Sequence, residues 1–461
     1  MGWDAVCDAA LILNFLMSYT AAIDQLNAMV PELHVKAGQP RRKFSLDEVR
    51  TLLGALGDPQ RRFPAVLIAG TNGKGSTAAT LGSILTEAGL RAGLYTSPHL
   101  EKPNERIRVN RAEIGDEDFA RLFFRVLNHA DRMVKERKLP QPPSYFEMLT
   151  ALAFLYFAER EVEIAVLEVG MGGRLDATNV VEPLLSIITD ISLDHMEWLG
   201  ETITAIAREK AGILRRGGTM ITLPQHPEAN QVLGEVATVL DARGVSAVDY
   251  MPAMKSKGPY SVKALGESVK VDSPLAGAHQ QRNVALAIAA AVELAERDGF
   301  NVPAGAIEVG IRRTRWPGRL ERTICAGVEW VLDVAHNPAG AWALRAGLRS
   351  ILEGRGPRIL IFSCLRDKPV DEMAQILFPL FDRVIVAPIH AARAAALEDL
   401  LAAARATGTP ATTAESVPEA VERAQQEAEG GVVVVSGSVY LVGDARAMLF
   451  RELLAEEGRL R

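Results

Sequence analysis

The chain has 461 residues, of which 48% are hydrophobic and 23% charged, and its formal net charge is −6. This is ordinary globular composition with enough apolar material for large cores. Because domains usually contain about 100–200 residues, we expect two or three of them. The mild excess of acidic residues gives no broad electrostatic attraction to nucleic acid, so any anion-binding feature has to be a local basic pocket.

The three cysteines, Cys7, Cys325 and Cys364, are far apart and show no metal-type spacing. This argues against a disulfide framework or a structural zinc site and favours a reducing cytoplasm. The apolar stretch at residues 9–17 is preceded by acidic residues and by no Lys or Arg, unlike a signal peptide. It is also shorter than the ~20 residues that span a bilayer. We expect an amphipathic helix or a frayed extension there, and no membrane association.

From residue 63 onward, short apolar runs alternate with longer helical stretches. Residues 65–69 predict a buried strand, which is followed by a glycine-rich turn and a helix over 75–88. Further strands are predicted at 93–96, 164–169 and 185–189. Continuous apolar strands separated by helices favour a parallel sheet that is covered on both faces.

Between residues 245 and 271 the pattern changes to short polar and apolar alternations, which predict a small antiparallel insertion, and a long helix follows over 278–297. A Pro-Gly pair within 312–319 marks a turn, where we place the domain boundary. Beyond it the sequence predicts a second α/β domain of about 140 residues, with an alanine-rich helix around 391–404. Its strands are predicted at 329–334, 358–363, 383–387 and 432–436.

A glycine-rich segment from Gly70 to Thr77 lies between the first strand and its helix. Glycines let backbone N–H groups converge on an anion, and the helix N-terminus adds its positive dipole end. Lys74 can reach a terminal phosphate, and the hydroxyls of Ser76 and Thr77 can bind phosphate oxygens or a metal. Two residues, rather than the usual four, separate Gly70 from Gly73. The alternative is a turn with a solvated lysine, and the loop alone indicates ATP or GTP but no reaction.

Two residues are candidate ligands for a divalent metal. His195 follows Asp194 and the strand that ends near residue 190, at the carboxyl edge where α/β ligand sites gather. A lone histidine there is usually structural, but near a phosphate loop it becomes a candidate ligand. Glu147 is a carboxylate early in an otherwise apolar helix over 145–157, and a magnesium ion would supply the partner that it needs.

Two loops carry candidate substrate-binding groups. Residues 96–100, Thr-Ser-Pro-His-Leu, and 104–107, Asn-Glu-Arg-Ile, offer hydroxyl, imidazole and guanidinium groups after a strand. A solvated surface loop is the alternative for this segment. Residues 168–179 leave another strand into a glycine-rich loop, in which Arg174 could neutralise an anion. The alternative for the second loop is a structural tight turn.

Six ordered motifs resemble folylpolyglutamate synthase and the bifunctional dihydrofolate synthase, which belong to the Mur ligase superfamily. The resemblance runs from about residue 45 to the C-terminus, and residues before about Ser18 lie outside it. The motifs are GTNGKGS at 70–76, TSPHL at 96–100, EVGMGGRLDATN at 168–179, DH at 194–195, EKAGI at 209–213 and DVAHNP at 333–338.

This resemblance implies an α/β fold in two parts. An N-terminal P-loop-type ATPase domain has a mainly parallel sheet and a small antiparallel insertion, and it precedes a C-terminal Rossmann-like domain. We therefore divide the chain into an extension and lead-in at 1–44, an ATP-binding central domain at 45–313 and a C-terminal ligase domain at 320–461. The second domain lacks a G-x-G-x-x-G fingerprint, so it is not predicted to bind a dinucleotide.

The resemblance also implies roles for individual residues. The lysine at position 210 corresponds to one that is carbamylated in the family, a change that turns a cation into an anion. The implied catalytic residues are Lys74, Lys210 and His336. The implied magnesium ligands are Ser97, Glu147 and His195. The implied ATP-binding residues are Thr71, Asn72, Gly73, Lys74, Gly75, Ser76, Thr77, Asn283, Arg319 and Asp333. The implied substrate-binding residues are Pro98, His99, Arg106, Arg174 and Asp176.

The implied activity is ATP-dependent ligation of L-glutamate to a folate, with ATP and Mg²⁺ as cofactors and no nucleic-acid or membrane partner. The substrate carboxylate attacks the γ-phosphate of ATP, and the amine of glutamate then displaces phosphate from the acyl phosphate. Such phosphoryl transfer needs charge neutralisation and positioning. Closure of the second domain, hinged near 315–319, would exclude water. The family resemblance implies a monomer.

Two alternatives remain. A cell-wall Mur ligase would act on a UDP-sugar peptide, but the Ser-Pro-His-Leu loop and the short segment before the phosphate loop argue against it. A P-loop switch or motor would hydrolyse nucleotide without forming an amide, and the loop spacing and the second α/β domain argue against that. Whether the substrate is tetrahydrofolate, dihydropteroate or both is left open, as are the glutamate chain length and the carbamylation of Lys210.

Overall fold

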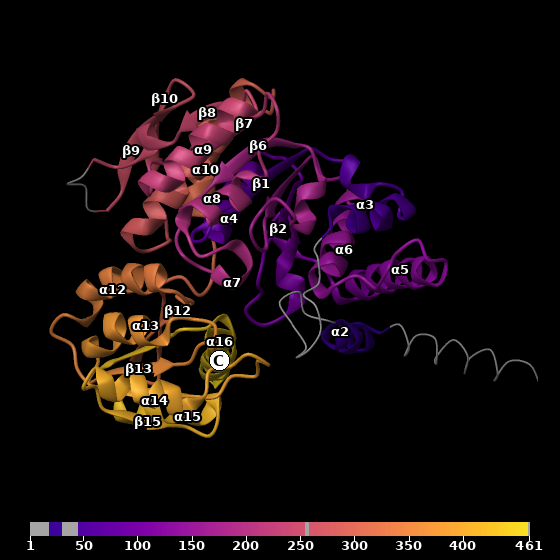
Figure 1. Ribbon diagram of the computed structural model, residues 1–461. Helices are drawn as coiled ribbons and strands as arrows, with labels where there is room; N and C mark the ends of the chain where they lie inside the picture. The colour runs from indigo at the N-terminus through magenta and orange to yellow at the C-terminus, as the bar shows by residue number, and fades with distance from the viewer. Residues whose placement is uncertain (1–17, 30–44, 254–257, 460–461) are drawn as a thin grey trace, which may run out of the picture.

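The computed structural model describes residues 18–29, 45–253 and 258–459, so the apolar stretch at 9–17 lies outside the described residues. Two α/β bodies face each other, an N-terminal one built on an eight-stranded sheet and a C-terminal one built on a six-stranded sheet (Figure 1). Both sheets are mainly parallel and a separate two-stranded hairpin is present, as the sequence predicts. Within the described residues, no helix combines the length and apolar character needed to span a bilayer.

The N-terminal sheet places the phosphate-loop strand between two buried parallel neighbours. Its strands, in spatial order, are β4 (Ala112–Glu113), β3 (Ile107–Val109), β2 (Ala92–Tyr95), β5 (Ile164–Glu168), β1 (Ala65–Ala69), β6 (Pro183–Ile188), β7 (Thr219–Thr222) and β8 (Arg243–Ser246). From β2 to β8 all pairings are parallel, whereas β3 and β4 are antiparallel additions at one edge. The carboxyl ends of β2, β5, β1 and β6 therefore lie at one edge of the sheet.

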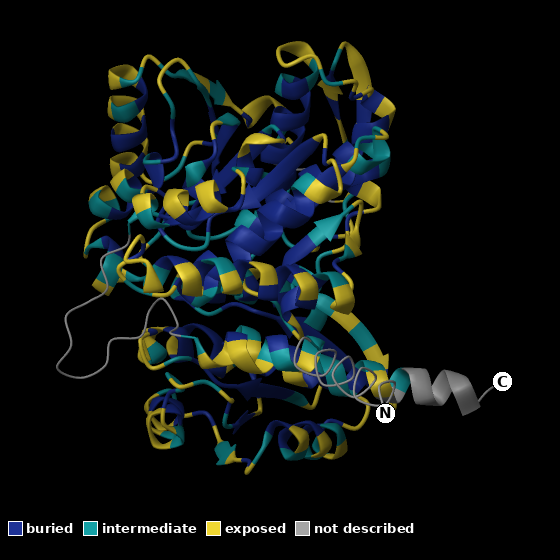
Figure 2. Cartoon of the chain, turned by 90° about the vertical axis from the view of Figure 1, so that its right-hand side faces the viewer, coloured by how far each residue is buried: buried dark blue, intermediate teal, exposed yellow. Residues whose placement is uncertain are grey.

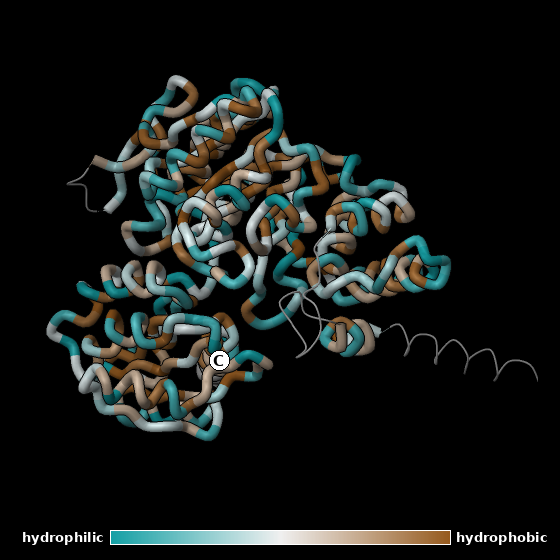
Figure 3. Tube along the Cα trace, in the orientation of Figure 1, coloured by the Kyte–Doolittle hydropathy of each residue, from teal (hydrophilic) through white to brown (hydrophobic). Residues whose placement is uncertain are grey.

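Helices cover both faces of this sheet. One layer contains α4 (Lys74–Glu87), α10 (Ala278–Glu296), α11 (Ala304–Arg312) and the hairpin β9 (Tyr260–Ala264) and β10 (Glu267–Val271). The other contains α2 (Tyr19–Ala28), α3 (Leu46–Ala55), α5 (Asp116–Lys135), α6 (Tyr145–Glu159), α8 (Ile203–Ala211) and α9 (Pro227–Val239). Along β1, Val66 and Ile68 pack into the first layer and Leu67 and Ala69 into the second, as strand alternation requires. The buried strands are dark blue in Figure 2 and brown in Figure 3.

Helix α2 is an integral part of the N-terminal body. Its Ala22 and Leu26 are fully buried in the core with α5. The Tyr19 ring packs edge-on against Phe119 at 5.6 Å, and its hydroxyl donates to Asn104 Oδ1 at 2.5 Å. We therefore propose that residues 19–28 belong with the central domain rather than with the lead-in.

The C-terminal sheet has the order β11 (Glu321–Cys325), β12 (Val328–Asp333), β16 (Val432–Ser436), β13 (Arg358–Phe362), β14 (Arg383–Val386) and β15 (Ala411–Thr413). Only β11 is antiparallel to its neighbour. One face packs against α12 (Pro338–Leu352), α13 (Val370–Leu377) and α14 (Leu397–Ala406). The other face packs against α15 (Val417–Glu427) and α16 (Val439–Arg459).

Two predicted elements differ from the structure. The helix predicted around 391–404 begins only at Leu397, because two of the preceding residues form backbone hydrogen bonds with the segment after β13. Ala395 donates its N–H to Cys364, and Arg366 donates to Arg393. The antiparallel insertion is present as β9 and β10, but residues 243–246 form the parallel edge strand β8 of the main sheet.

Candidate active site

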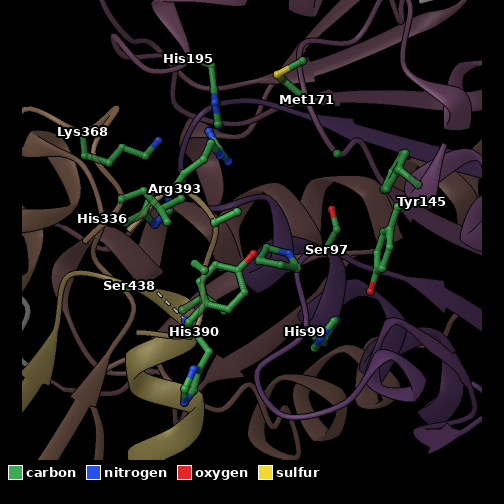
Figure 4. Close-up of a pocket in the computed structure, with 18 of the residues that line it drawn as sticks. Ser97, His99, Tyr145, Met171, His195, His336, Lys368, His390, Arg393 and Ser438 are labelled. Carbon is green, nitrogen blue, oxygen red and sulfur yellow. Dashed lines mark hydrogen bonds between the residues drawn. The ribbon is translucent and has the colours of Figure 1, made fainter. Parts of the chain in front are cut away.

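A cleft of about 560 Å³ separates the carboxyl ends of the two sheets. Figure 4 shows side chains of both bodies pointing into it. From the N-terminal body come Ser97, His99, Tyr145, Met171 and His195, among others. From the C-terminal body come His336, Lys368, His390, Arg393 and Ser438, among others. The cleft therefore depends on both domains.

The phosphate loop leaves β1 and enters α4 at Gly73. Gly73, the residue that caps α4, has φ +91° and makes no side-chain capping bond. A Cβ atom at Gly73 would lie 2.2 Å from Asn283 Oδ1, so close approach to α10 requires glycine there. The hydroxyl of Thr77 is fully buried and has no hydrogen-bond partner among the described residues. A phosphate oxygen or a phosphate-bound metal would satisfy it.

Two lysines converge on this loop. Lys74 Nζ donates to the carbonyl oxygens of Gly70 at 3.2 Å and Thr71 at 3.3 Å, and Lys210 Nζ donates to Gly70 at 2.8 Å. Burial, reinforced by the neighbouring Lys74 charge, lowers the pKa of Lys210 to about 7. Lys74 supplies a cation to the loop, whereas Lys210 is partly neutral at physiological pH.

The loop is tied to the segment that follows β6. The Thr71 N–H donates to Asp190 O at 2.8 Å, and the Thr71 hydroxyl donates to Ser192 O at 3.0 Å. The Asn72 amide donates to Ser192 Oγ at 3.1 Å. These bonds connect the phosphate loop to the chain just before Asp194, so the two predicted motifs form one structure.

Glu168, at the carboxyl end of β5, lies beside Ser97. It accepts the Ser97 N–H at 3.0 Å. Burial raises the pKa of Glu168, although Lys74 and the Ser97 N–H favour its ionised form. His195 adopts a left-handed backbone conformation with φ +50°, and burial lowers its pKa to about 3, which keeps the imidazole neutral.

Glu147 lies in the first turn of α6 and takes part in its N-terminal cap. Its carboxylate accepts the Ser144 N–H at 2.7 Å, and its own N–H donates to Ser144 Oγ at 3.3 Å, which completes a capping box at the start of α6. We therefore replace Glu147 with Glu168 as the carboxylate candidate near Ser97. Across residues 18–29, 45–253 and 258–459, no group of three or more His, Cys, Asp or Glu side chains is arranged to hold a metal.

The predicted substrate loop lines the cleft with Ser97, Pro98, His99 and Arg106. Arg106 donates through Nε to His99 Nδ1 at 2.9 Å and lies over the Tyr145 ring at 5.3 Å. Burial, together with the Arg106 charge, lowers the pKa of His99 to about 3. The imidazole is therefore a neutral acceptor that orients the guanidinium.

The second glycine-rich loop is shaped by Asp176 rather than by Arg174. The Asp176 carboxylate accepts the N–H groups of Met171 and Thr178, each at 3.0 Å, and so holds Met171 at the cleft wall. Arg174 instead pairs with Glu209 at 2.9 Å, has a side chain that is 55% exposed and is not among the cleft residues. The prediction that Arg174 binds substrate is not supported by this geometry.

The two bodies are joined at an interdomain cluster formed by Asp194, His336, Asn337 and Lys368. The Asp194 carboxylate accepts Lys368 Nζ at 2.6 Å and Asn337 Nδ2 at 3.0 Å, and His336 Nε2 lies 3.7 Å away. Burial opposes ionisation of Asp194, but His195, Lys368 and His336 outweigh it and hold its pKa well below the usual range. Asn337 also donates to Asn72 at 3.1 Å, which places the cluster against the phosphate loop.

The remaining predicted nucleotide residues surround the turn between the domains. Asp333 accepts the N–H groups of Leu320 at 2.8 Å and Ala335 at 2.9 Å, so its carboxylate fixes the backbone on either side. Arg319 lies in that turn and donates to Gly318 O at 3.0 Å. Asn283 donates to Gln280 within α10 and closely approaches the loop at Gly73.

The sequence analysis did not predict several cleft residues of the C-terminal body, namely Lys368, His390, Arg393, Ser438 and Tyr440. They follow the carboxyl ends of β13, β14 and β16. The rule that ligand sites gather at the carboxyl ends of parallel strands could have identified them. The alanine-rich composition around Arg393 concealed its position by indicating a helix.

Comparison with known proteins identifies the architecture. The Mur ligase middle domain family matches residues 68–291, and the Mur ligase, glutamate ligase domain family matches residues 318–439. The chain is 34% identical over 417 residues to the dihydrofolate synthase/folylpolyglutamate synthase of Bacillus subtilis, which covers 88% of this chain and 95% of that protein.

Solved structures give the same result. Mycobacterium tuberculosis folylpolyglutamate synthase complexed with ADP and AMPPCP has a TM-score of 0.81 at 34% identity, over 88% of this chain and 95% of that one. E. coli FolC in complex with DHPP and ADP has a TM-score of 0.80 at 29% identity, over 94% and 98% of the two chains. With its phosphate loop and its two-domain cleft, this chain belongs to the folylpolyglutamate synthase/dihydrofolate synthase family of the Mur ligases.

Proposed function

We propose that this protein ligates L-glutamate to a folate in an ATP-dependent reaction that proceeds through an acyl phosphate. The observation that carries the proposal is the arrangement of the cleft. One wall presents Ser97, Arg106 and His195, and the facing wall presents His336, Lys368 and Arg393. The bond from Asn337 to Asn72 holds the phosphate loop, with its Lys74, against the interdomain cluster beside this cleft. ATP and two carboxylate substrates are all anionic, and each meets cationic groups in this space. Membership of the ligase family supports the same reaction.

In the first step, a carboxylate oxygen of the folate attacks the γ-phosphorus of ATP, and ADP leaves. Lys74 and the N–H groups at the start of α4 neutralise charge on the phosphates. In the second step, the glutamate amine attacks the acyl carbon, inorganic phosphate leaves and the amine loses a proton. His336 orients the phosphate or the incoming amine, because partial burial lowers its pKa and leaves a neutral imidazole at the cleft.

The donor set at the loop suits magnesium. Ser97 supplies a hydroxyl, Glu168 a carboxylate and His195 a neutral imidazole. Mg²⁺ commonly takes one or two protein carboxylates and completes its shell with phosphate oxygens and water. A bound ion would neutralise the charge of the ATP phosphates, and the buried Thr77 hydroxyl lies at the base of the same loop.

Exchanging the two candidate carboxylates for amides separates their roles. Glu168→Gln is expected to lower kcat by about 10²-fold and to weaken Mg²⁺-dependent ATP binding, because it removes an anion from the metal site. Glu147→Gln is expected to keep near-normal turnover and to lose ~1 kcal/mol of stability through the cap of α6. Steady-state assays measure kcat, calorimetric titration of ATP with and without Mg²⁺ measures binding, and thermal unfolding measures stability. The reverse pattern would restore Glu147 as the ligand.

We further propose that Lys210 is carbamylated. A pKa of about 7 leaves much of this amine neutral at pH 7–8, and a neutral amine adds CO₂ to form a carbamate with release of a proton. The Lys74 charge disfavours the ammonium form of Lys210, and it would instead attract the carbamate anion. With ¹³C-labelled bicarbonate, NMR is expected to show one carbamate signal that is absent in Lys210→Ala. Turnover should fall in CO₂-free buffer. Unchanged turnover and an unlabelled wild-type protein would contradict this proposal.

The substrate range is tested with one assay. Purified protein is incubated with ATP, L-glutamate and either dihydropteroate or tetrahydrofolate, and the amide product is measured by mass spectrometry. We expect product with at least one of them, and the pair of results assigns synthase, polyglutamylation or both. A UDP-muramoyl substrate is the control for a cell-wall ligase. ATP hydrolysis without an amide product from any of the three would favour a nucleotide switch and overturn the proposal.

A further inference from the structure

We propose that Leu100, Gly443 and Arg446 form an interdomain contact that sets the position of the substrate loop, so that the loop reaches its cleft geometry only when the C-terminal domain is docked. This inference rests on the proposed function. It concerns the far side of the loop, which faces away from the cleft and which the reaction described above does not use. We call this group the Leu100 contact.

The first observation is that the side chain of Leu100 crosses the domain boundary. Leu100 belongs to the N-terminal body, yet it packs against the apolar core between the C-terminal sheet and α16. A Cβ atom at Gly318 would lie 3.4 Å from its two methyl carbons and 3.1 Å from Val334. Leu100 directly follows His99, a residue of the cleft wall. A displacement of Leu100 is therefore transmitted to the substrate side of the loop.

The second observation concerns a glycine inside a helix. Gly443 is buried within α16, where glycine lowers helix stability relative to alanine. A Cβ atom there would lie 2.1 Å from the carbonyl oxygen of Leu100 and 2.9 Å from its carbonyl carbon. The backbone of the substrate loop thus packs directly against the backbone of α16, and any side chain at position 443 would push the loop away by about 1 Å to restore an ordinary contact.

The third observation is a set of polar bonds that holds both sides of this contact. The Glu105 carboxylate accepts three consecutive N–H groups, from Leu100 at 2.9 Å and from Glu101 and Lys102 at 2.8 Å each, so the loop moves as one piece. Arg446 donates to Glu101 at 2.7 Å from α16.

Arg446 also connects the loop to the turn between the domains. It donates to Glu321 at 3.0 Å, and Glu321 in turn accepts the Gly318 N–H at 2.8 Å. The same guanidinium therefore joins the substrate loop, α16 and the interdomain turn. Because Leu100, Gly443 and Arg446 do not line the cleft, they act as positioning residues rather than as catalytic ones.

The test compares two glycine-to-alanine substitutions inside helices. Gly443→Ala introduces the contact with Leu100, and Gly234→Ala in α9 is the matched control, because a Cβ atom at Gly234 meets nothing within 4 Å. A shift of about 1 Å in a substrate-positioning group can cost about 10²-fold in rate. We expect Gly443→Ala to lower kcat/KM for the folate by about that factor, with KM for ATP within about twofold of the control.

Hydrogen exchange of the full-length protein provides a readout that is independent of turnover. Peptides covering residues 97–106 are expected to exchange faster in Gly443→Ala than in Gly234→Ala, whereas peptides covering β1 and β13 are expected to exchange alike in the two variants. Arg446→Met removes the bonds to Glu101 and Glu321 without a steric change and should show the same effects to a smaller extent. This second variant keeps the test valid if Gly443→Ala folds poorly. Exchange of 97–106 that is unchanged in both variants would overturn the proposal. Absence of ligation by the wild-type protein would instead overturn the proposed function.

Discussion

Lys74→Ala is expected to reduce turnover by about 10²–10³-fold while the protein stays folded, because it deletes a cation that neutralises charge developing on the transferred phosphoryl group. The ammonium of Lys74 bonds only to the carbonyl oxygens of Gly70 and Thr71 and lies near the second ammonium of Lys210. Its removal breaks no ion pair within 4 Å among the described residues, and the relieved repulsion with Lys210 opposes the lost attraction to buried Glu168, so we expect the free energy of unfolding to change by less than about 0.5 kcal/mol. Steady-state rates with saturating ATP, together with thermal unfolding, measure both quantities.

The control for this substitution is Lys270→Ala on β10, whose side chain is 56% exposed and lies in the hairpin outside the cleft. It removes the same charge from the chain without touching the loop, so turnover should stay within about twofold of wild type. If a folded Lys74→Ala protein turned over at a rate similar to that of Lys270→Ala, the assignment of the phosphate loop would be wrong.

Asp194→Asn is expected to disrupt docking of the two domains and to lower kcat/KM for ATP and folate together. The substitution leaves the Lys368 ammonium, which is 4% exposed, without its carboxylate partner at 2.6 Å. Breaking a buried ion pair in this way costs about 3–5 kcal/mol. Asp367 lies 3.9 Å from the same ammonium and offsets part of that loss. Denaturant unfolding measures the stability, and small-angle X-ray scattering measures the separation of the domains.

A double substitution tests whether the loss comes from the unpaired charge. Asp194→Asn combined with Lys368→Gln leaves two neutral side chains that can hydrogen-bond, so stability should recover relative to Asp194→Asn alone. Turnover should remain low, because Lys368 also lines the cleft. Asp367→Asn is the matched control and should have a smaller effect, since it leaves the shorter Asp194–Lys368 pair intact. Equal losses in the two single variants would contradict a special role for Asp194.

The phosphate loop and the fold class could be predicted because their signals are local. Residues 65–69, the glycines that follow and the helix of α4 are contiguous, and each local preference agrees with the strand–turn–helix that forms. The same holds for the buried strands of the second domain, because their short apolar runs are typical of buried strands.

The partner of Ser97 could not be chosen in the same way. Glu147 and Glu168 are both carboxylates at the edge of an apolar element, and the local signal that separates them is the Ser-x-x-Glu spacing at 144–147, which is typical of a capping box. Only the strand order β2–β5–β1 places the end of β5 next to Ser97, and the capping bonds of α6 show that Glu147 is engaged there.

The sequence by itself therefore determined that this protein has a nucleotide-binding loop on a parallel sheet, two α/β domains and the motifs of a ligase family. The tertiary structure decided which side chains meet. It turned Arg174 toward Glu209, brought Asp194 to Lys368 and kept residues 391–396 out of the helix, so that Arg393 lines the cleft. The physical reason is that local preferences act over a few residues, whereas a site between two domains is formed by contacts between segments that lie more than a hundred residues apart.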